Sequence, residues 1–425
     1  MSAKYSNKMI VIGGGVIGVA TLAALCSKGV PAVLLEAGDD LALETSFANG
    51  GMMSASQPEP WNGSGALGHL LTSLFHPSSA MKMHWSVLPE LTGWGLKFLA
   101  NSFGAVAQRS AESNFKLARY SAECTAQLVQ AHNLQFDHAN NGSLKVFSSK
   151  LEFEKSRKMA ERLQEFGLSF ELLDHAGAIA VEPALCCTQD HIAGAIYYPD
   201  DGIGDVRKFT LELAKQAVKA GGEIKLCSKV TGLIVEAGQV VGIKSNTKKM
   251  FGDVIVCAGT SASSLLASIG IKLPVQPVKG YSITLKAANL LEEMPKMPVI
   301  NEAKHIAISP IGDRLRVVGT AEFAGYDHSL PPERLQLLTT TFNKIYPHLS
   351  NKLDWQKALS WAGLRPMSAD GIPILGKSPM DGLWLNCGHG HLGWTMAAGS
   401  AQLLVDIITG TAPAIEIAAY GFDRC

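Results

Sequence analysis

The sequence predicts an α/β fold in which a Rossmann-like domain is combined with a second α+β domain built on an antiparallel sheet. An apolar strand at residues 9–12 leads directly into a glycine-rich turn and a helix, which is how a Rossmann βαβ unit begins. Short strand patterns between residues 272 and 350 predict the antiparallel sheet. The chain has 425 residues, 47% of them hydrophobic, which is enough material for a large core and two domains.

The glycine-rich turn has the spacing G-x-G-x-x-G, with Gly13, Gly15 and Gly18 at its three fixed positions. The first glycine permits a tight turn, the second lets the backbone approach a pyrophosphate, and the third allows close helix–strand packing. Val16 and Ile17 lie between them, where the N-terminus of the following helix faces the phosphates. The turn therefore predicts a dinucleotide site.

A second buried strand at residues 31–36 completes the βαβ unit and ends in Glu36. This acid lies 23 residues after Gly13, near the roughly 20 expected for a carboxylate that binds ribose hydroxyls. We therefore expect Glu36, with Ala37 beside it, to hold the ribose of the dinucleotide.

Composition and charge narrow the class of protein. Lys+Arg and Asp+Glu are both 37, so the formal net charge is zero and nothing suggests binding to nucleic acid. The eight cysteines form no C-x-x-C and no metal-type pairing with histidine, which predicts free thiols in a reducing compartment and no metal site. The first strand begins too early for a cleaved signal peptide, and no stretch of 18 apolar residues occurs, so we expect a cytoplasmic protein.

The rest of the chain alternates helix and strand patterns. A buried strand over residues 251–257 ends in Ala258-Gly259, and a turn at residues 388–393 opens a C-terminal helix. Apolar spacing predicts further helices at 107–133, 150–167, 205–220, 332–345 and 393–409, and strands at 223–227, 230–235, 240–245, 281–285, 306–309 and 315–319.

Five blocks carry a resemblance to a known family. They are ALETS at 42–46, EPAL at 182–185, PVKGYS at 277–282, WAGLRPMSADG at 361–371 and NCGHGHLGWTM at 386–396. With the N-terminal glycine motif, they resemble the bacterial FAD-dependent D-amino acid dehydrogenase (small subunit) family, within the D-amino-acid oxidase and glycine oxidase superfamily. The resemblance runs nearly end to end, and the last two blocks are long and specific.

The resemblance implies non-covalent FAD and the oxidation of a D-amino acid to a 2-oxo acid and ammonia. Hydride would leave Cα for flavin N5, which needs no obligatory base if the amine arrives neutral, and a respiratory acceptor such as a quinone would take the electrons. The turn at 388–393 offers N–H groups and a positive helix end to reduced flavin. Small residues in the segment 46–51 would permit close backbone contact with the flavin. The cofactor residues implied in these regions and at the adenine are Ser46, Asn49, Gly50, Gly51, Val230, Ala258, Gly259, Gly388, His389, Gly390, Leu392, Gly393 and Trp394.

Two residues are candidates for the substrate. Arg365 lies in a G-x-R-P stretch whose arginine binds the substrate carboxylate in the resembling oxidases, and a guanidinium can hold a carboxylate with two parallel hydrogen bonds. Tyr281 could cover the substrate or donate to its carboxylate, although a tyrosine that begins a strand is more often simple packing.

Departures from the family concern the substrate side chain. The family usually carries a polar residue near Met52, a threonine where His391 stands and a more polar pair than Gly202-Ile203. A more apolar lining suits an apolar D-amino acid or a cyclic D-imino acid of the D-proline type. The alternatives are a flavin oxidase of glycine, sarcosine or an opine, and a flavin-bearing subunit or tRNA-wobble modification domain that needs a partner. Neutral charge counts against RNA.

The sequence also predicts a discontinuous domain division and an apolar patch. The FAD-binding domain should comprise residues 1–60, 195–270 and 355–425, and the substrate domain residues 61–194 and 271–354.

A run of large apolar residues is either core, a lid over the flavin or a peripheral membrane patch that meets the quinone pool. Its members are Trp61, Leu67, Leu70, Leu71, Leu74, Phe75, Trp85, Trp94, Leu96, Phe98 and Leu99.

Overall fold

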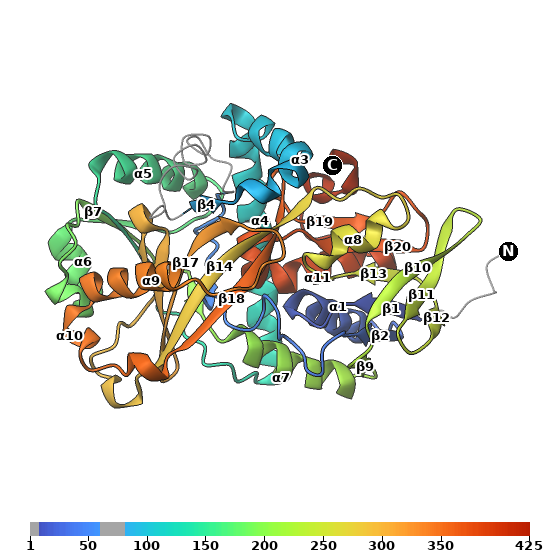
Figure 1. The fold of residues 1–425 in the computed structure, drawn as a ribbon, viewed down its shortest axis with the longest axis horizontal. Helices are drawn as coiled ribbons and strands as arrows, with labels where there is room; N and C mark the ends of the chain where they lie inside the picture. Colours follow the sequence, from blue (N-terminus) through green and yellow to red (C-terminus); the bar gives the residue numbers. More distant parts are fainter. Residues whose placement is uncertain (1–7, 60–80) are drawn as a thin grey trace.

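The computed structural model describes residues 8–59 and 81–425. Two large sheets lie side by side along the long axis of the molecule, and the N-terminal βαβ unit is in the half that holds the six-stranded sheet (Figure 1). The α/β class with a Rossmann-like unit and a second α+β region is thereby confirmed.

The six-stranded sheet has the order β19-β20-β13-β1-β2-β9. Strands β20, β13, β1, β2 and β9 run parallel to their neighbours, and only the edge strand β19 is antiparallel. Its strands are β1 (Met9–Ile12), β2 (Ala32–Leu35), β9 (Glu223–Lys225), β13 (Val254–Val256), β19 (Ile374–Lys377) and β20 (Leu383–Cys387).

Both faces of this sheet are covered, which explains the continuous apolar runs of its strands. Alternate residues such as Val11 and Ile10 belong to cores on opposite faces. Three helices cover one face: α1 (Val16–Ser27), α7 (Val206–Lys219) and α11 (Gly393–Thr409). A small antiparallel sheet and α8 (Ser261–Ala267) cover the other. The strands of the small sheet are β10 (Val230–Glu236), β11 (Gln239–Ser245) and β12 (Lys249–Phe251), so the predicted hairpin is confirmed.

The nine-stranded sheet is mostly antiparallel, with two parallel pairs, β15–β5 and β17–β4. Its order is β18-β14-β17-β16-β15-β5-β7-β6, with β4 beside β17. The strands are β4 (Met81–Met83), β5 (Ser143–Phe147), β6 (Glu171–Leu173), β7 (Gly194–Tyr198), β14 (Val275–Lys286), β15 (Val299–Asn301), β16 (Ile306–Ile311), β17 (Arg314–Phe323) and β18 (Leu359–Ser368).

Helices pack on this sheet and at the boundary between the two halves. The helices α6 (His175–Val181), α9 (Pro332–Ile345) and α10 (Pro347–Ser350) contribute to one core with the sheet. Among the residues that the structure describes, the remaining α-helices are α3 (Leu88–Ala100), α4 (Gly104–His132) and α5 (Lys150–Gln164). Helix α4 packs so closely on α11 that a Cβ at Gly399 would lie 2.7 Å from Cβ of Ser121. The helices predicted at 107–133 and 150–167 are therefore present.

Short elements complete the structure. A two-stranded ladder pairs β3 (Met52–Met53) with β8 (Gly202–Ile203). The 3-10 helices are η1 (Trp85–Val87), η2 (Pro183–Cys187), η3 (Ala288–Leu290), η4 (Glu302–Lys304), η5 (Trp355–Lys357), η6 (Gly390–Leu392), η7 (Ala418–Tyr420) and η8 (Phe422–Arg424).

The predicted domain boundaries differ from the sheets at two strands. β7 and β18 both belong to the nine-stranded sheet, although they fall within the segments 195–270 and 355–425 of the predicted FAD-binding domain. Pairing partners far along the chain decide to which sheet a strand belongs. The division into domains stays a prediction.

Candidate active site

The glycine turn sits where β1 and β13 end together. Gly13 has φ +112°, and a Cβ there would lie 2.6 Å from the carbonyl oxygen of Cys257. A Cβ at Gly18 would lie 1.9 Å from the carbonyl oxygen of Gly13. No side chain fits at either position, so the first and third glycines are required by the packing of the turn. Ala258 and Gly259 follow Cys257, which brings the Ala-Gly strand end beside the glycine motif.

The N-terminus of α1 is left open to a ligand by its own residues. Gly15 is the N-cap, no side chain caps the helix there, and no acidic residue lies in the first turn. The segment that follows β2 returns to this point, where Ser46 Oγ accepts a hydrogen bond of 3.1 Å from the backbone N–H of Val16. Ile17 packs against the core of the helical face. The second glycine and Ser46 are therefore brought together.

Glu36 lies at the same edge of the sheet. Its carboxylate accepts hydrogen bonds from the backbone N–H of Gly14 at 2.5 Å and of Gly38 at 2.7 Å. Its carbonyl oxygen accepts from the N–H of Ser228, two residues before Val230 begins β10. Ala37, beside Glu36, is exposed. Sequence-distant candidates for the ribose and adenine therefore meet at one edge, and the ribose role of Glu36 stays a prediction.

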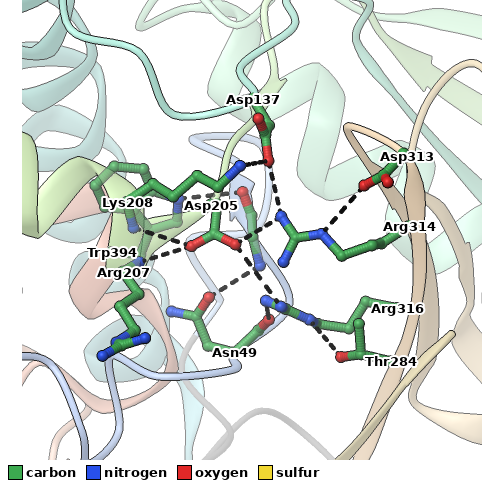
Figure 2. Close-up of polar contacts among 11 residues, drawn as sticks. Asn49, Asp137, Asp205, Arg207, Lys208, Thr284, Asp313, Arg314, Arg316 and Trp394 are labelled. Atoms are coloured by element: carbon green, nitrogen blue, oxygen red, sulfur yellow. Dashed lines mark hydrogen bonds and ion pairs between the residues drawn. The ribbon is translucent and has the colours of Figure 1, made fainter. Parts of the chain in front are cut away.

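The backbone of residues 49–51 is held from both halves of the molecule (Figure 2). Arg316 of β17 donates from Nη1 to the carbonyl oxygen of Asn49 at 3.0 Å. Trp394 of α11 donates from Nε1 to the carbonyl oxygen of Gly51 at 3.1 Å. Asn49 Oδ1 accepts from the N–H of Gly51, which has φ +71°. A Cβ at Gly50 would lie 3.1 Å from Val318, so this segment runs against the nine-stranded sheet.

A partly buried cluster of charged side chains beside this segment was missed by sequence reasoning. Asp205 caps α7 by accepting from two backbone N–H groups at 3.0 Å, and its Oδ2 lies 2.9 Å from Nη2 of Arg314 and 3.9 Å from Nη2 of Arg316. Asp137 accepts from both Arg314 and Lys208 at 2.7 Å (Figure 2). Burial lowers the pKa of Arg316 to about 10, against the opposing effect of Asp205. The N-cap position of Asp205 was the only signal in the sequence.

The turn after β20 leads into α11 through two left-handed glycines. Gly388 has φ +75° and Gly390 has φ +57°, and a Cβ at Gly390 would lie 2.8 Å from Sδ of Met367. The backbone of His389 forms an isolated antiparallel β-bridge with Met367. The side chain of His389 is 4% exposed, and burial lowers its pKa to about 3, so its ring is neutral. Leu392 and Trp394 are buried, and no side chain caps α11, whose first residue is Gly393.

Arg365 lies on β18, next to β14. Its guanidinium lies over Gly280, where a Cβ would approach Cζ to 2.4 Å, and Nη1 donates to the carbonyl oxygen of Thr320 at 3.0 Å. Burial lowers the pKa of Arg365 to about 10, so it remains a cation at neutral pH. Burial, and to a smaller extent the charge of Arg365, lower the pKa of His391 to about 4. A cation and a neutral imidazole therefore share the site.

Trp361 lies on the same face of β18 as Arg365, and Phe47 packs near it. A Cβ at Gly363 would lie 1.9 Å from the ring of Trp361, so the indole folds along the strand toward Arg365. The rings of Trp361 and Phe47 lie 6.3 Å apart. Thr45 Oγ1 donates to the carbonyl oxygen of Leu364 at 2.7 Å, which joins the 44–51 segment to the strand that carries Arg365. Trp361 and Phe47 were not singled out from the sequence.

Tyr281 is not brought together with Arg365. The register pairs Tyr281 with Ala362 and Gly280 with Gly363, so strand alternation sends Tyr281 to the face of the sheet opposite to Arg365. Its side chain is 1% exposed and its hydroxyl donates to Glu322 at 2.7 Å. Burial raises the pKa of Tyr281 well above its usual value, and Glu322 adds to this effect. The structure therefore places Tyr281 in the core of the nine-stranded sheet.

The apolar residues proposed for a membrane contact include both buried and exposed side chains in the structure. Six members, from Trp61 to Phe75, lie outside the described residues. Trp94 and Phe98 are buried and stack on each other, whereas Trp85 is 63% and Leu96 67% exposed, and Leu99 is half-buried. Within residues 8–59 and 81–425, no helix has the length and apolar character needed to cross a membrane, and no group of three potential metal ligands occurs.

A family model described as FAD dependent oxidoreductase (DAO) matches residues 8–407. The chain belongs to this family. A D-amino acid dehydrogenase of Cereibacter sphaeroides is 37% identical over 98% of this chain and 95% of its own length. A D-amino acid dehydrogenase of Paramagnetospirillum magneticum is 36% identical over 98% of both chains. The predicted resemblance is confirmed.

Solved structures of low sequence identity share the fold. The glycine oxidase from Geobacillus kaustophilus has a TM-score of 0.76 at 21% identity, over 99% of this chain and 100% of its own. The L-proline dehydrogenase from P. horikoshii has a TM-score of 0.78 at 19% identity, over 99% of this chain and 98% of its own.

The residues present fit FAD. The cradle has no room for side chains at Gly13 and Gly18, begins a helix whose N-cap is Gly15, without a side chain of its own, and has the carboxylate of Glu36 at its edge. The backbone segments 46–51 and 388–393 then approach the same region from β3 and α11. This donor set suits a pyrophosphate, a ribose and a flavin ring in that order.

Proposed function

We propose that the protein catalyses the FAD-dependent oxidative deamination of a D-amino acid to the 2-oxo acid and ammonia. Arg365 carries the proposal, because its half-buried guanidinium lies beside the segments assigned to the flavin. Burial lowers the pKa of this side chain and so disfavours its charged form. A substrate carboxylate would compensate that cost with two charge-assisted hydrogen bonds and would fix the tilt of the amino acid.

Each part of the cofactor has candidate residues. Gly13, Gly15, Val16 and Ile17 would hold the pyrophosphate, Glu36 and Ala37 the ribose, and Val230 the adenine. FAD supplies the two-electron acceptor for the Cα–H bond. Around the flavin ring and its approach we assign Ser46, Asn49, Gly50, Gly51, Ala258, Gly259, Gly388, His389, Gly390, Leu392, Gly393 and Trp394.

The chain's own residues orient the substrate and exclude water. Arg365 would hold the carboxylate, and Trp361 and Phe47 would face the side chain. The thioethers of Met52 and Met53 add adaptable apolar surface near the same segment. This lining favours an apolar D-amino acid or a cyclic D-imino acid. The D configuration rests on the relatives that are named D-amino acid dehydrogenase.

Removal of the guanidinium tests the substrate class. Arg365→Ala should lower kcat/KM, with a loss of transition-state stabilisation of about 2–5 kcal/mol, since the substrate carboxylate loses its partner in a partly dry site. Arg365→Lys should recover only part of this, because an ammonium does not match the planar fork. FAD content should stay normal. The primary amine that lacks the carboxylate should be a poor substrate and indifferent to the change; equal losses for both substrates would make Arg365 structural.

The acceptor is proposed to be a respiratory quinone rather than oxygen. The alternative is an oxidase, because a glycine oxidase shares the fold. Dye reduction without peroxide production, measured with one D-amino acid, would support the dehydrogenase. Stoichiometric peroxide would support the oxidase. Activity of the purified single chain would exclude the need for a partner subunit.

We also propose a peripheral contact with a membrane surface through η1, α3 and the turn between α3 and α4. Trp85, Leu96 and Phe103 are each more than half exposed, and Lys97 lies beside Leu96, which is the aromatic and basic mixture found at lipid interfaces. The holoenzyme should float with anionic liposomes, and Trp85→Ser with Leu96→Ser should reduce this. Leu151→Ser, at a residue equally exposed on α5, is the control. Failure of the unaltered protein to float would remove the proposal.

A further inference from the structure

Asp201 is a buried carboxylate at the junction of three segments. It lies between β7 and β8 and is 2% exposed. Its Oδ2 accepts from Oγ of Ser56 at 2.5 Å and from Oγ of Ser143 at 2.6 Å, and its Oδ1 accepts from the backbone N–H of Ser56 at 3.3 Å. Its carbonyl oxygen also accepts from the N–H of Gly142. All of these contacts are donors to oxygen, which is the pattern that an ionised carboxylate satisfies.

Two of the three side-chain contacts reach the turn at residues 54–57, which directly follows β3. The turn is held at its start by Thr395 of α11, whose Oγ1 accepts from the N–H of Ser54 at 3.2 Å. At its end, the side chain of Gln57 donates to Oγ of Ser56 at 3.3 Å. The ladder between Met53 and Gly202 fixes the strand that precedes the turn. Asp201 therefore supplies the hydrogen bonds that fix the middle of this turn.

The turn contacts the substrate site through Gln57. The backbone of Gln57 raises the pKa of His391, whereas burial and the charge of Arg365 lower it. The turn is also bonded through Ser54 to Thr395, four residues beyond His391, and the 3-10 helix that carries His391 packs on β18, which carries Arg365. A displacement of the turn would therefore move the surroundings of His391, next to the cation assigned to the substrate.

We propose that Asp201 is a positioning residue of the substrate site: its carboxylate fixes the 54–57 turn, and the turn holds His391 beside Arg365. This inference rests on the proposed function, in which Arg365 binds the substrate carboxylate. Asp201 does not touch the substrate in this arrangement, and acts through Ser56 and Gln57.

The titratable groups around Asp201 come from each packed segment. On β5 the next side chain on the same side is Lys145, which forms an ion pair of 3.0 Å with Glu302. From β7 comes Tyr198, whose pKa burial holds above its usual value. Glu59, just beyond the turn, is exposed. Burial raises the pKa of Asp201 to about 6, against the hydrogen bonds from Ser143 and Ser56.

Two serines provide a matched test. Ser56→Ala and Ser143→Ala each remove one hydroxyl from the same oxygen of Asp201, at nearly equal distances, but only Ser56 belongs to the turn. In the FAD-loaded enzyme, Ser56→Ala and Asp201→Asn should raise KM for the D-amino acid roughly tenfold, the effect of one lost hydrogen bond. Their kcat and FAD content should stay near those of the unaltered enzyme, and Ser143→Ala should leave KM nearly unchanged.

Two further readouts separate positioning from general stability. Amide hydrogen exchange at residues 54–57 should accelerate in Ser56→Ala and Asp201→Asn but not in Ser143→Ala. The kcat/KM of the unaltered enzyme should fall as the pH drops through about 6, because the protonated carboxyl can no longer accept all three bonds. The inflection near pH 6 should be absent in Asp201→Asn, whereas the fall caused by protonation of the substrate amine remains.

Each outcome decides something specific. Equal effects of the two serine variants, or an inflection near pH 6 that persists in Asp201→Asn, would overturn the positioning role. If Asp201→Asn does not fold, Ser56→Ala against Ser143→Ala still decides it. If Arg365→Ala leaves amino acid kinetics unchanged, the proposed function fails, and exchange at residues 54–57 still reports whether Asp201 fixes the turn.

Discussion

The guanidinium of Arg365 occupies the space above Gly280 that a side chain on the neighbouring strand would otherwise fill. A Cβ at Gly280 would lie 2.4 Å from Cζ of Arg365, well inside van der Waals contact. The glycine of the KGY sequence in β14 and the arginine of the LRP sequence in β18 are therefore a matched pair, although 85 positions separate them.

The first prediction follows from this pair. Gly280→Ala should displace the guanidinium and lower kcat/KM for the amino acid by roughly 10- to 100-fold, because misplacement by about 1 Å can cost that much. FAD content should stay normal. Gly232→Ala is the control, since Gly232 also lies in a strand but a Cβ there meets nothing within 4 Å. Unchanged steady-state kinetics in Gly280→Ala would contradict the role of the pair.

The second prediction separates Tyr281 from catalysis. Tyr281→Phe removes a hydrogen bond to the buried carboxylate of Glu322, which Arg334 and His84 also contact. The free energy of unfolding should fall by about 1.5–3 kcal/mol, as for hydrogen bonds to charged groups. The KM for the amino acid should hardly change. Tyr326→Phe, at an exposed tyrosine that donates to Thr260, is the control. A large rise in KM with unchanged stability would return Tyr281 to the substrate site.

The third prediction concerns Glu36. Glu36→Ala should weaken FAD binding by about 1–3 kcal/mol, through lost charge-assisted hydrogen bonds to the ribose. The same change removes the acceptor for the N–H groups of Gly14 and Gly38, so the apoprotein should also lose stability. Flavin fluorescence titration of the apoprotein measures the Kd, with the exposed Asp39→Ala as control. An unchanged Kd would show that Glu36 serves the turn alone.

The fourth prediction gives Asp201 a signature in stability. Its folded pKa of about 6 lies above the unfolded value of 3.8, so the folded state holds this proton more tightly. Its contribution is therefore fully present below pH 4 and is lost as the pH rises to 6. The loss corresponds to about 3 kcal/mol for a shift of this size.

Urea unfolding at pH 4 and pH 7 measures this effect. The free energy of unfolding of Asp201→Asn, relative to that of the unaltered protein, should be higher at pH 7 than at pH 4, because an amide carries no charge to desolvate. The same relative stability at both pH values would contradict the raised pKa. Over the same range, stability and kcat/KM of the unaltered enzyme are expected to change in opposite directions.

Local patterns predicted the parts of the site that lie close together in sequence. The strand, glycine turn, helix and acid of residues 9–36 are where the sequence placed them, because the pattern of the βαβ unit is local, and Gly18 packs on the backbone of Gly13 within the turn itself. The hairpin β10–β11 and the helix α11 follow equally from local periodicity. Arg365 was singled out by family resemblance, and the structure adds the glycine beneath it.

Contacts between distant segments were beyond the sequence. Strand alternation, together with the register between β14 and β18, decides that Tyr281 and Arg365 point to opposite faces, and that register is set by pairing partners. Trp361 and Phe47, and the link from Asp201 to His391, likewise depend on segments that meet only in the folded chain. No spacing rule connects such residues.

The chain leaves the six-stranded sheet after β2 and returns to it at β9, then leaves after β13 and returns at β19. The nine-stranded sheet is therefore made of two insertions into a nucleotide-binding core, and a single crossover between two relatives would split it. A chimera that exchanges both insertions together, with residues 44–57 and 388–395 taken from the same parent, keeps every contact around Arg365 native. Transfer of substrate specificity between relatives should therefore require that both insertions are exchanged together.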